Sequence, residues 1–271
     1  MRIQSTYSHR RAEEIIQSHS GLKALVNEIK SAIEDISDEE LKKEFMDHSK
    51  SSTFRSIPIS GDKSLSKKIN RLISTRLIEN SWANESNIFQ MNSIIEGEDK
   101  AWRLDFAKVA TPSIRDKRAG KPAPGVAVEV SFNHGEALAW NLIKPVISAE
   151  LNPIPKETDI GEGIGVIICA TYALKVAGGF DNAVGSFEKA VGYLKPLHGL
   201  LTAPLLLIGI DEPESFHIGH VKPHKNGNTK KGVIIDGSYS AAHGETTVSR
   251  ESLCLYPQSD CFTDSLNQPN D

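Results

Sequence analysis

A strand-like segment with a carboxylate at its centre constrains this chain more than any other feature. Residues 126–132 read Val-Ala-Val-Glu-Val-Ser-Phe, with apolar residues at every second position. This alternation predicts a half-buried β-strand, because successive strand side chains point to opposite faces. Glu129 lies in its middle, and a carboxylate there is costly to bury alone. We therefore expect Glu129 to contact a metal ion, a hydrogen-bond network or a basic side chain such as Arg103 or Lys108.

A second carboxylate, Asp105, precedes this segment within Trp102–Phe106, and residues 101–107 can also form an extended segment. An Asp on one strand and a Glu on its neighbour suit Mg²⁺, which takes oxygen ligands and usually needs only one or two carboxylates. The main-chain carbonyl of Val130 could add a ligand. Such an ion activates water and stabilises charge during phosphodiester hydrolysis. Ser131, on the same strand face as Glu129, could orient the attacking water.

Composition sets only broad limits on what the chain can be. Its 271 residues are 39% hydrophobic and 24% charged, as expected for one large globular domain or at most two. No apolar run approaches the roughly 18 residues of a membrane span, and no secretory signal is evident, so we expect a cytoplasmic protein. The net charge of −4 argues weakly against nucleic acid. Basic residues nevertheless gather at 115–121 and 222–231, and an acidic protein can carry a basic cleft.

The first part of the chain predicts helices. Apolar residues from Leu22 to Ile36 follow helical spacing, with Ser20 as a plausible N-cap. A second helix from about Ser64 has a basic polar side, which indicates either a solvated surface or contact with a DNA backbone. The basic residues on that side are Lys63, Lys67, Lys68, Arg71 and Arg76.

From about residue 100, strand and helix patterns alternate. We expect strands at 126–132, 164–171 and 204–210, and helices at 136–151 and 182–194. This alternation predicts an α/β domain with a mixed central sheet and helices on both faces. After Asp211 the pattern weakens: residues 233–235 predict one short strand, and residues 240–271 predict little structure.

Four segments in a fixed order resemble one enzyme family. They are Tyr7-Ser-His-Arg-Arg-Ala-Glu-Glu-Ile-Ile16, Ser81-Trp-Ala-Asn-Glu85, Leu104-Asp-Phe-Ala-Lys108 with Val126–Phe132, and Ala203-Pro-Leu-Leu-Leu-Ile-Gly-Ile210. They resemble the type II restriction endonucleases of the BglII/BstYI/BamHI group, BstYI most closely. The resemblance implies an endonuclease core domain over residues 1–211, helical in 1–95 and catalytic α/β in 100–211. Residues 212–271 would be a weakly structured extension with no counterpart.

The same resemblance implies a function and a cofactor. Members of this group are homodimers that grip double-stranded DNA and cut each strand of a palindrome with Mg²⁺. We therefore expect a recognition site containing GATC and a paired DNA methyltransferase in the host. By position, Asp105 and Glu129 would be metal ligands and Glu85 a further acidic active-site residue. The helix at 136–151 would form part of the dimer interface, although an intramolecular core would explain its apolar residues equally well.

Ser131 is the main departure from the family. It falls where this group has Gln or Glu and many related nucleases have Lys. Serine is shorter and cannot act as a strong base, so Ser131 would at most orient water. Two alternatives stay open: Ser131 could be a strand residue without a catalytic role, and Glu85 could lie on a helix surface.

A long loop over residues 110–125 is a second departure, because it widens the spacing between Asp105 and Glu129. It offers Asp116 as an alternative metal ligand, although the match of Asp-Phe-x-Lys favours Asp105. The loop could reach a DNA groove or lie free on the surface. Its basic residues are Arg115, Lys117, Arg118 and Lys121.

The family resemblance assigns base recognition to one segment of the chain. This segment precedes the helix that starts near Asn182. Lys175 could donate to guanine and Asn182 could pair with adenine. The alternative is a turn at Gly178-Gly179 with Asn182 as a helix cap.

Two other functions fit the same residues: a repair or structure-specific nuclease on this core, and a DNA-binding protein that has lost catalysis. A nucleotide-dependent small-molecule enzyme is not indicated, since the chain has neither a Gly-x-Gly-x-x-Gly fingerprint after a strand nor a P-loop.

Overall fold

One mixed six-stranded sheet organises the molecule, with strand order β1-β8-β7-β6-β5-β4. The computed structural model describes residues 1–47, 52–54, 57–90, 102–112, 118, 120, 123–132, 135–150, 156–222 and 230–239. The strands are β1 (Ile3–His9), β4 (Ala83–Asn87), β5 (Arg103–Val109), β6 (Gly125–Ser131), β7 (Ile164–Ala170) and β8 (Leu205–Ile210). Neighbours among β6, β7 and β8 are parallel, and the remaining pairs are antiparallel. The predicted mixed central sheet is confirmed.

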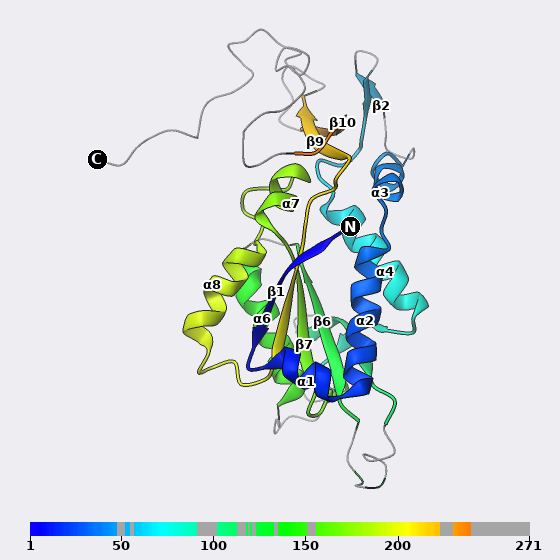
Figure 1. The fold of residues 1–271 in the computed structure, drawn as a ribbon. Helices are drawn as coiled ribbons and strands as arrows, with labels where there is room; N and C mark the ends of the chain where they lie inside the picture. The colour runs from blue at the N-terminus through cyan, green and yellow to red at the C-terminus, as the bar shows by residue number, and fades with distance from the viewer. Residues whose placement is uncertain are drawn as a thin grey trace, which may run out of the picture.

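Helices cover both faces of this sheet (Figure 1). Helices α2 and α4 lie on one side, and α6 and α8 lie on the other. The helices are α1 (Ala12–Ser18), α2 (Ser20–Glu34), α3 (Asp38–Phe45), α4 (Ser66–Glu79), α6 (Ala137–Ala149), α7 (Tyr172–Ala177) and α8 (Phe187–Leu197). Parallel strands need a crossover connection, and α6 supplies it between β6 and β7.

Strand β6 is buried along its whole length, so the prediction of a half-buried strand was wrong. Its valines belong to the large core cluster that includes α2 and α4. Its other face is covered because α6 packs against β6 and β7. Glu129 therefore has no solvent-exposed face and must be satisfied inside the protein.

The N-terminal part is not wholly helical, because it begins with β1. This strand pairs antiparallel with β8 at the edge of the sheet. Its sequence, Ile-Gln-Ser-Thr-Tyr-Ser-His, is mostly polar, and the apolar partner strand β8 supplies most of the buried surface. The cap of α2 also differs from the prediction: His19, not Ser20, is the N-cap and accepts a hydrogen bond from the Leu22 amide at 3.3 Å.

Beyond Asp211 the chain forms more structure than the one short strand predicted. Strands β9 (Phe216–Val221) and β10 (Lys231–Asp236) pair antiparallel. They pack with the small hairpin β2 (Ser52–Phe54) and β3 (Ile57–Ile59) through an apolar cluster. Residues 240–271, expected to be weakly structured, lie outside the described residues. Within the described ranges, no helix has both the length and the apolar character that crossing a bilayer requires.

A buried glycine and an exposed one offer a matched test of this packing. A Cβ at Gly163 would lie 2.0 Å from the Gly125 carbonyl oxygen, whereas a Cβ at Gly192, inside α8, would meet nothing within 4 Å. We expect Gly163→Ala to lower the free energy of unfolding by at least ~2 kcal/mol. The clashing Gly125 carbonyl belongs to the backbone and cannot move away as a flexible side chain could. Gly192→Ala should raise the free energy of unfolding by about 0.5–1 kcal/mol. Urea denaturation measures both, and equal midpoints for the two variants would contradict the packing described.

Candidate active site

Two carboxylates lie near each other where the pairing of β5 and β6 ends. The last pair of the antiparallel register joins Phe106 to Val128, and Asp105 and Glu129 are the next residues along the two strands. The Val130 amide donates a hydrogen bond to Asp105 Oδ2 at 2.7 Å. Burial raises the pKa of Asp105, and the amide of Val130 and the charge of Lys144 oppose that rise. The structure thus brings together the two residues that the sequence predicted as metal ligands.

Glu129 is only 1% exposed, and its partner is a lysine that the sequence pattern did not indicate. Lys144 Nζ, from α6, lies 2.5 Å from Glu129 Oε2. Burial, followed by the charge of Asp105, raises the pKa of Glu129 to about 8, while Lys144 acts in the opposite direction. Its Oε1 atom is buried and has no hydrogen-bond partner among the described residues. Part of this carboxylate is therefore available to a cation.

Neither basic residue predicted as the partner of Glu129 plays that role. Lys108 Nζ lies 2.8 Å from Glu28 Oε2, on the α2 side of the sheet. Arg103 lies 3.5 Å from Glu85 and so points toward the edge strand.

Glu85 lies on β4 rather than on a helix surface. The register of β4 and β5 places it opposite Asp105, between the pairs Asn84–Phe106 and Ser86–Leu104. Its side chain is 70% exposed, and its charge raises the pKa of Asp105. Its φ of 48° is uncommon for a residue other than glycine. The structure therefore places Glu85 beside Asp105, with its own side chain exposed to solvent.

Ser131 is buried against α6, and its hydroxyl is hydrogen-bonded to a residue of that helix. Its hydroxyl accepts a hydrogen bond from Asn141 Nδ2 at 3.1 Å, and only 2% of the residue is exposed. This contact gives Ser131 a structural role in holding the start of α6 to the end of β6.

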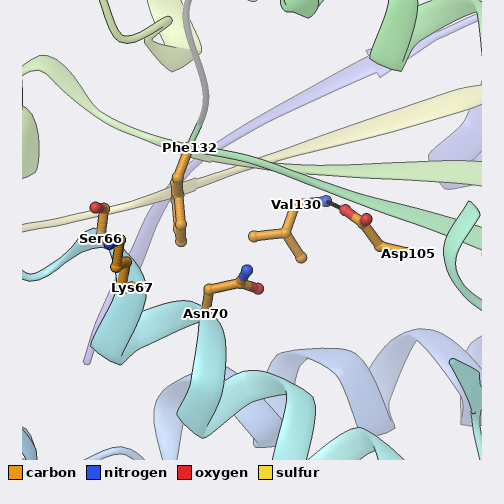
Figure 2. A pocket seen from close by; sticks show the side chains of 6 residues that line it. All are labelled: Ser66, Lys67, Asn70, Asp105, Val130 and Phe132. Atoms are coloured by element: carbon orange, nitrogen blue, oxygen red, sulfur yellow. Dashed lines mark hydrogen bonds between the residues drawn. The ribbon is translucent and has the colours of Figure 1, made fainter. Parts of the chain in front are cut away.

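An open pocket lies beside Asp105, as Figure 2 shows. Its lining residues are Ser66, Lys67, Asn70, Asp105, Val130 and Phe132. The first turns of α4 form one wall, and the start of β5 and the end of β6 form the other. The basic side of α4 was the sequence signal for this wall, but the sequence could not show that it faces Asp105.

Among the basic residues at this side of α4, Lys67 differs from the others in its ion pairing. Lys63, Lys68, Arg71 and Arg76 form ion pairs with Asp181, Asp62, Glu44 and Glu40, respectively. Lys67 is exposed and, within the described parts of the chain, forms no ion pair. Its ammonium group is therefore available to an anion in the pocket.

The residues predicted to read bases lie together, but not in a loop before a helix at Asn182. Lys175 is part of α7, and its Nζ donates to the Asn182 carbonyl at 2.7 Å. Helix α8 begins five residues later, at Phe187, and Ser186 is its N-cap. The predicted helix start and the cap at Asn182 were both wrong, because the Ser186 hydroxyl supplies the cap. A DNA contact by Lys175 or Asn182 stays a prediction.

Most of the basic loop falls outside the described residues, namely Arg115, Asp116, Lys117 and Lys121. Arg118 is described and exposed. Because Asp116 lies outside the described residues, the choice between Asp105 and Asp116 as metal ligand stays a prediction.

The carboxylates meet the demands of a divalent cation that takes oxygen ligands. Asp105 and Glu129 together match the one or two carboxylates that Mg²⁺ usually uses, and Glu129 Oε1 lacks a partner among the described residues. The described residues hold no group of three or more His, Cys, Asp or Glu side chains that would suit a fully protein-enclosed metal. Asp105 and Glu129 therefore suit a divalent ion that keeps several of its own water ligands.

The comparisons with known proteins decide the family. The model of the family described as restriction endonuclease BglII/BglIII matches residues 4–210. The chain belongs to the BglII/BglIII restriction endonuclease family. Membership supports a nuclease that acts on DNA phosphodiester bonds. A special closeness to BstYI stays a prediction.

Solved structures agree with this family in fold. Restriction endonuclease BglII complexed with a DNA 16-mer is 16% identical, with a TM-score of 0.50, over 87% of this chain and 100% of that chain. Free BglII is also 16% identical over the same shares, with a TM-score of 0.44. No curated protein matches the chain. At this identity the likeness to the DNA-bound structure shows the BglII-type fold alone.

Proposed function

We propose that this member of the BglII/BglIII family is a type II restriction endonuclease that hydrolyses both strands of a palindromic DNA site with Mg²⁺. The proposal includes a homodimer, because a palindrome presents the same bond to two active sites. A site containing GATC and a paired methyltransferase in the host are parts of the proposal that rest on the resemblance.

The observation that carries the proposal is the pair of neighbouring carboxylates Asp105 and Glu129, of which Asp105 lines an open pocket. Asp105 and Glu129 would hold the ion, with the Val130 carbonyl as a further ligand in the proposal. When bound, Mg²⁺ supplies a water of lowered pKa and charge stabilisation at the phosphorus and the leaving oxygen. The protein residues position these groups and exclude bulk water, since Glu129 and its surroundings are buried.

The pocket wall formed by α4 supports a place for the DNA backbone. Lys67 and Asn70 line the same pocket as Asp105, so a phosphate there would lie between a basic side chain and the carboxylate that holds the metal. Lys175, Asn182 and the basic loop with Arg118 complete the proposed DNA contacts.

Replacing Lys67 tests this contact. We expect Lys67→Ala to weaken duplex binding several-fold and to reduce the slope of log affinity against log salt by about one, because one phosphate contact is lost. Filter binding between 50 and 200 mM NaCl measures both. Lys195→Ala, an exposed lysine on α8, serves as the control and should change neither. An unchanged slope for Lys67→Ala would exclude it as a phosphate contact.

A plasmid digest tests the proposed function as a whole. Incubation of the purified chain with plasmid DNA and Mg²⁺ should give discrete bands, and none with EDTA. Run-off sequencing of the products then reads the recognition site and the cut position. A smear, or cutting only at branched DNA, would indicate a structure-specific nuclease instead. No cutting of any DNA would contradict the proposal.

A further inference from the structure

A buried lysine reaches the candidate active site from an element outside β5 and β6. Lys144 lies on α6 and is only 9% exposed. Its Nζ lies 2.5 Å from Glu129 Oε2 and donates to the Arg103 carbonyl at 2.9 Å. Arg103 is two residues before Asp105 on β5. Lys144 therefore links β6 to β5 two residues from Asp105.

Lys144 acts on the Glu129 carboxylate directly and on β5 through the Arg103 carbonyl. A buried ion pair by itself adds little to stability, and here one carboxylate oxygen is left without a partner among the described residues. Stability alone is therefore a weak reason for this lysine.

The strand position two residues after Glu129 does not supply such a cation. Ser131 is buried and accepts a hydrogen bond from Asn141, one helical turn before Lys144 on the same side of α6. Helix α6 thus contacts Ser131 with an amide and Glu129 with an ammonium group. The cationic side chain comes from the helix instead of the strand.

We propose that Lys144 is the cationic positioning residue of the hydrolytic site: it fixes the orientation of the Glu129 carboxylate and supplies the positive charge that Ser131 cannot. Because its ammonium group pairs with the same carboxylate that would hold the metal, Lys144 lowers the affinity of the site for the ion. During hydrolysis its charge stabilises the site around Asp105 and Glu129. This inference rests on the proposed nuclease function, and the test below separates the two.

Lys144→Met tests the proposal through two readouts that should move in opposite directions. Mn²⁺ affinity, measured by the electron paramagnetic resonance of free Mn²⁺, should rise about tenfold, because the competing cation is gone. Single-turnover cleavage should fall at least ~100-fold, because the charge and the positioning of Glu129 are lost. A role in stability alone would not tighten metal binding while slowing hydrolysis.

The controls are a matched lysine and a second substitution. Lys108→Met breaks another lysine–glutamate pair, between Lys108 of β5 and Glu28 of α2, and should change neither readout. Ser131→Ala should slow cleavage less than ~5-fold. Lys144→Gln keeps a donor for the Arg103 carbonyl and replaces Lys144→Met if thermal unfolding shows that the methionine variant does not fold.

Three outcomes decide the matter. Tighter Mn²⁺ binding with slower cleavage supports the proposal. Unchanged or weaker Mn²⁺ binding, or cleavage within ~3-fold of the unchanged chain, overturns it. If the unchanged chain cuts no DNA, the nuclease function fails, and Mn²⁺ affinity alone then decides whether Lys144 belongs to a metal site.

Discussion

Replacing Asp105 by Asn is expected to slow Mg²⁺-dependent cleavage by ~10³-fold or more while leaving duplex binding within a few-fold of the unchanged chain. The asparagine carbonyl can still accept the hydrogen bond that the Val130 amide donates at 2.7 Å. The strand geometry is therefore kept, and the charge that holds the metal is lost. Single-turnover cleavage and filter binding in EDTA measure the two effects separately.

Asp159→Asn is the matched control for this substitution. Asp159 also accepts a backbone amide hydrogen bond, from Gly161 at 2.9 Å, but its side chain is 64% exposed and lies outside the pocket. This variant should cut at the rate of the unchanged chain. If Asp105→Asn also cut within ~5-fold of that rate, Asp105 would not be a metal ligand.

Without metal, the free energy of unfolding should fall by several kcal/mol as the pH rises from about 4.5 to about 8, through the titration of Glu129. The pKa of Glu129 is raised in the folded protein, from 4.5 to about 8, chiefly by burial. The folded state therefore binds a proton that the unfolded state has already released in this range, and this contribution is lost as the pH rises. One pKa unit corresponds to about 1.4 kcal/mol.

Glu129→Gln isolates this effect, because glutamine keeps the shape of the side chain and does not titrate. Urea unfolding in EDTA from pH 4.5 to pH 8.5 should give curves that diverge, with the glutamine variant the more stable at high pH. The histidines His9 and His220 act in the opposite direction, since burial lowers the pKa of each, and they cancel in the comparison. Parallel curves would show that Glu129 titrates normally.

The sequence predicted those parts of the fold that depend on local apolar patterns. Strands β7 and β8 are continuous apolar runs, and the structure buries both on both faces. Strand β1 was missed because an edge strand can be mostly polar when its neighbour supplies the apolar surface. The full burial of β6 was missed because it depends on α6, which returns across the sheet from a later part of the chain.

The candidate site was predictable only in part, for a similar reason. The cost of burying a carboxylate required a cation near Glu129, and that requirement can be read from the strand. The identity of the cation cannot, since Lys144 reaches Glu129 through the crossover helix. The pocket formed with Lys67 likewise depends on how α4 packs over the sheet.

Anomalous diffraction from crystals of the chain grown with duplex DNA and Mn²⁺ tests the central claim most directly. The account predicts a Mn²⁺ ion bound by one carboxylate oxygen of Asp105 and one of Glu129, next to a DNA phosphate in the pocket with Lys67. A Mn²⁺ ion bound elsewhere on the protein, with Glu129 still paired only to Lys144, would contradict it.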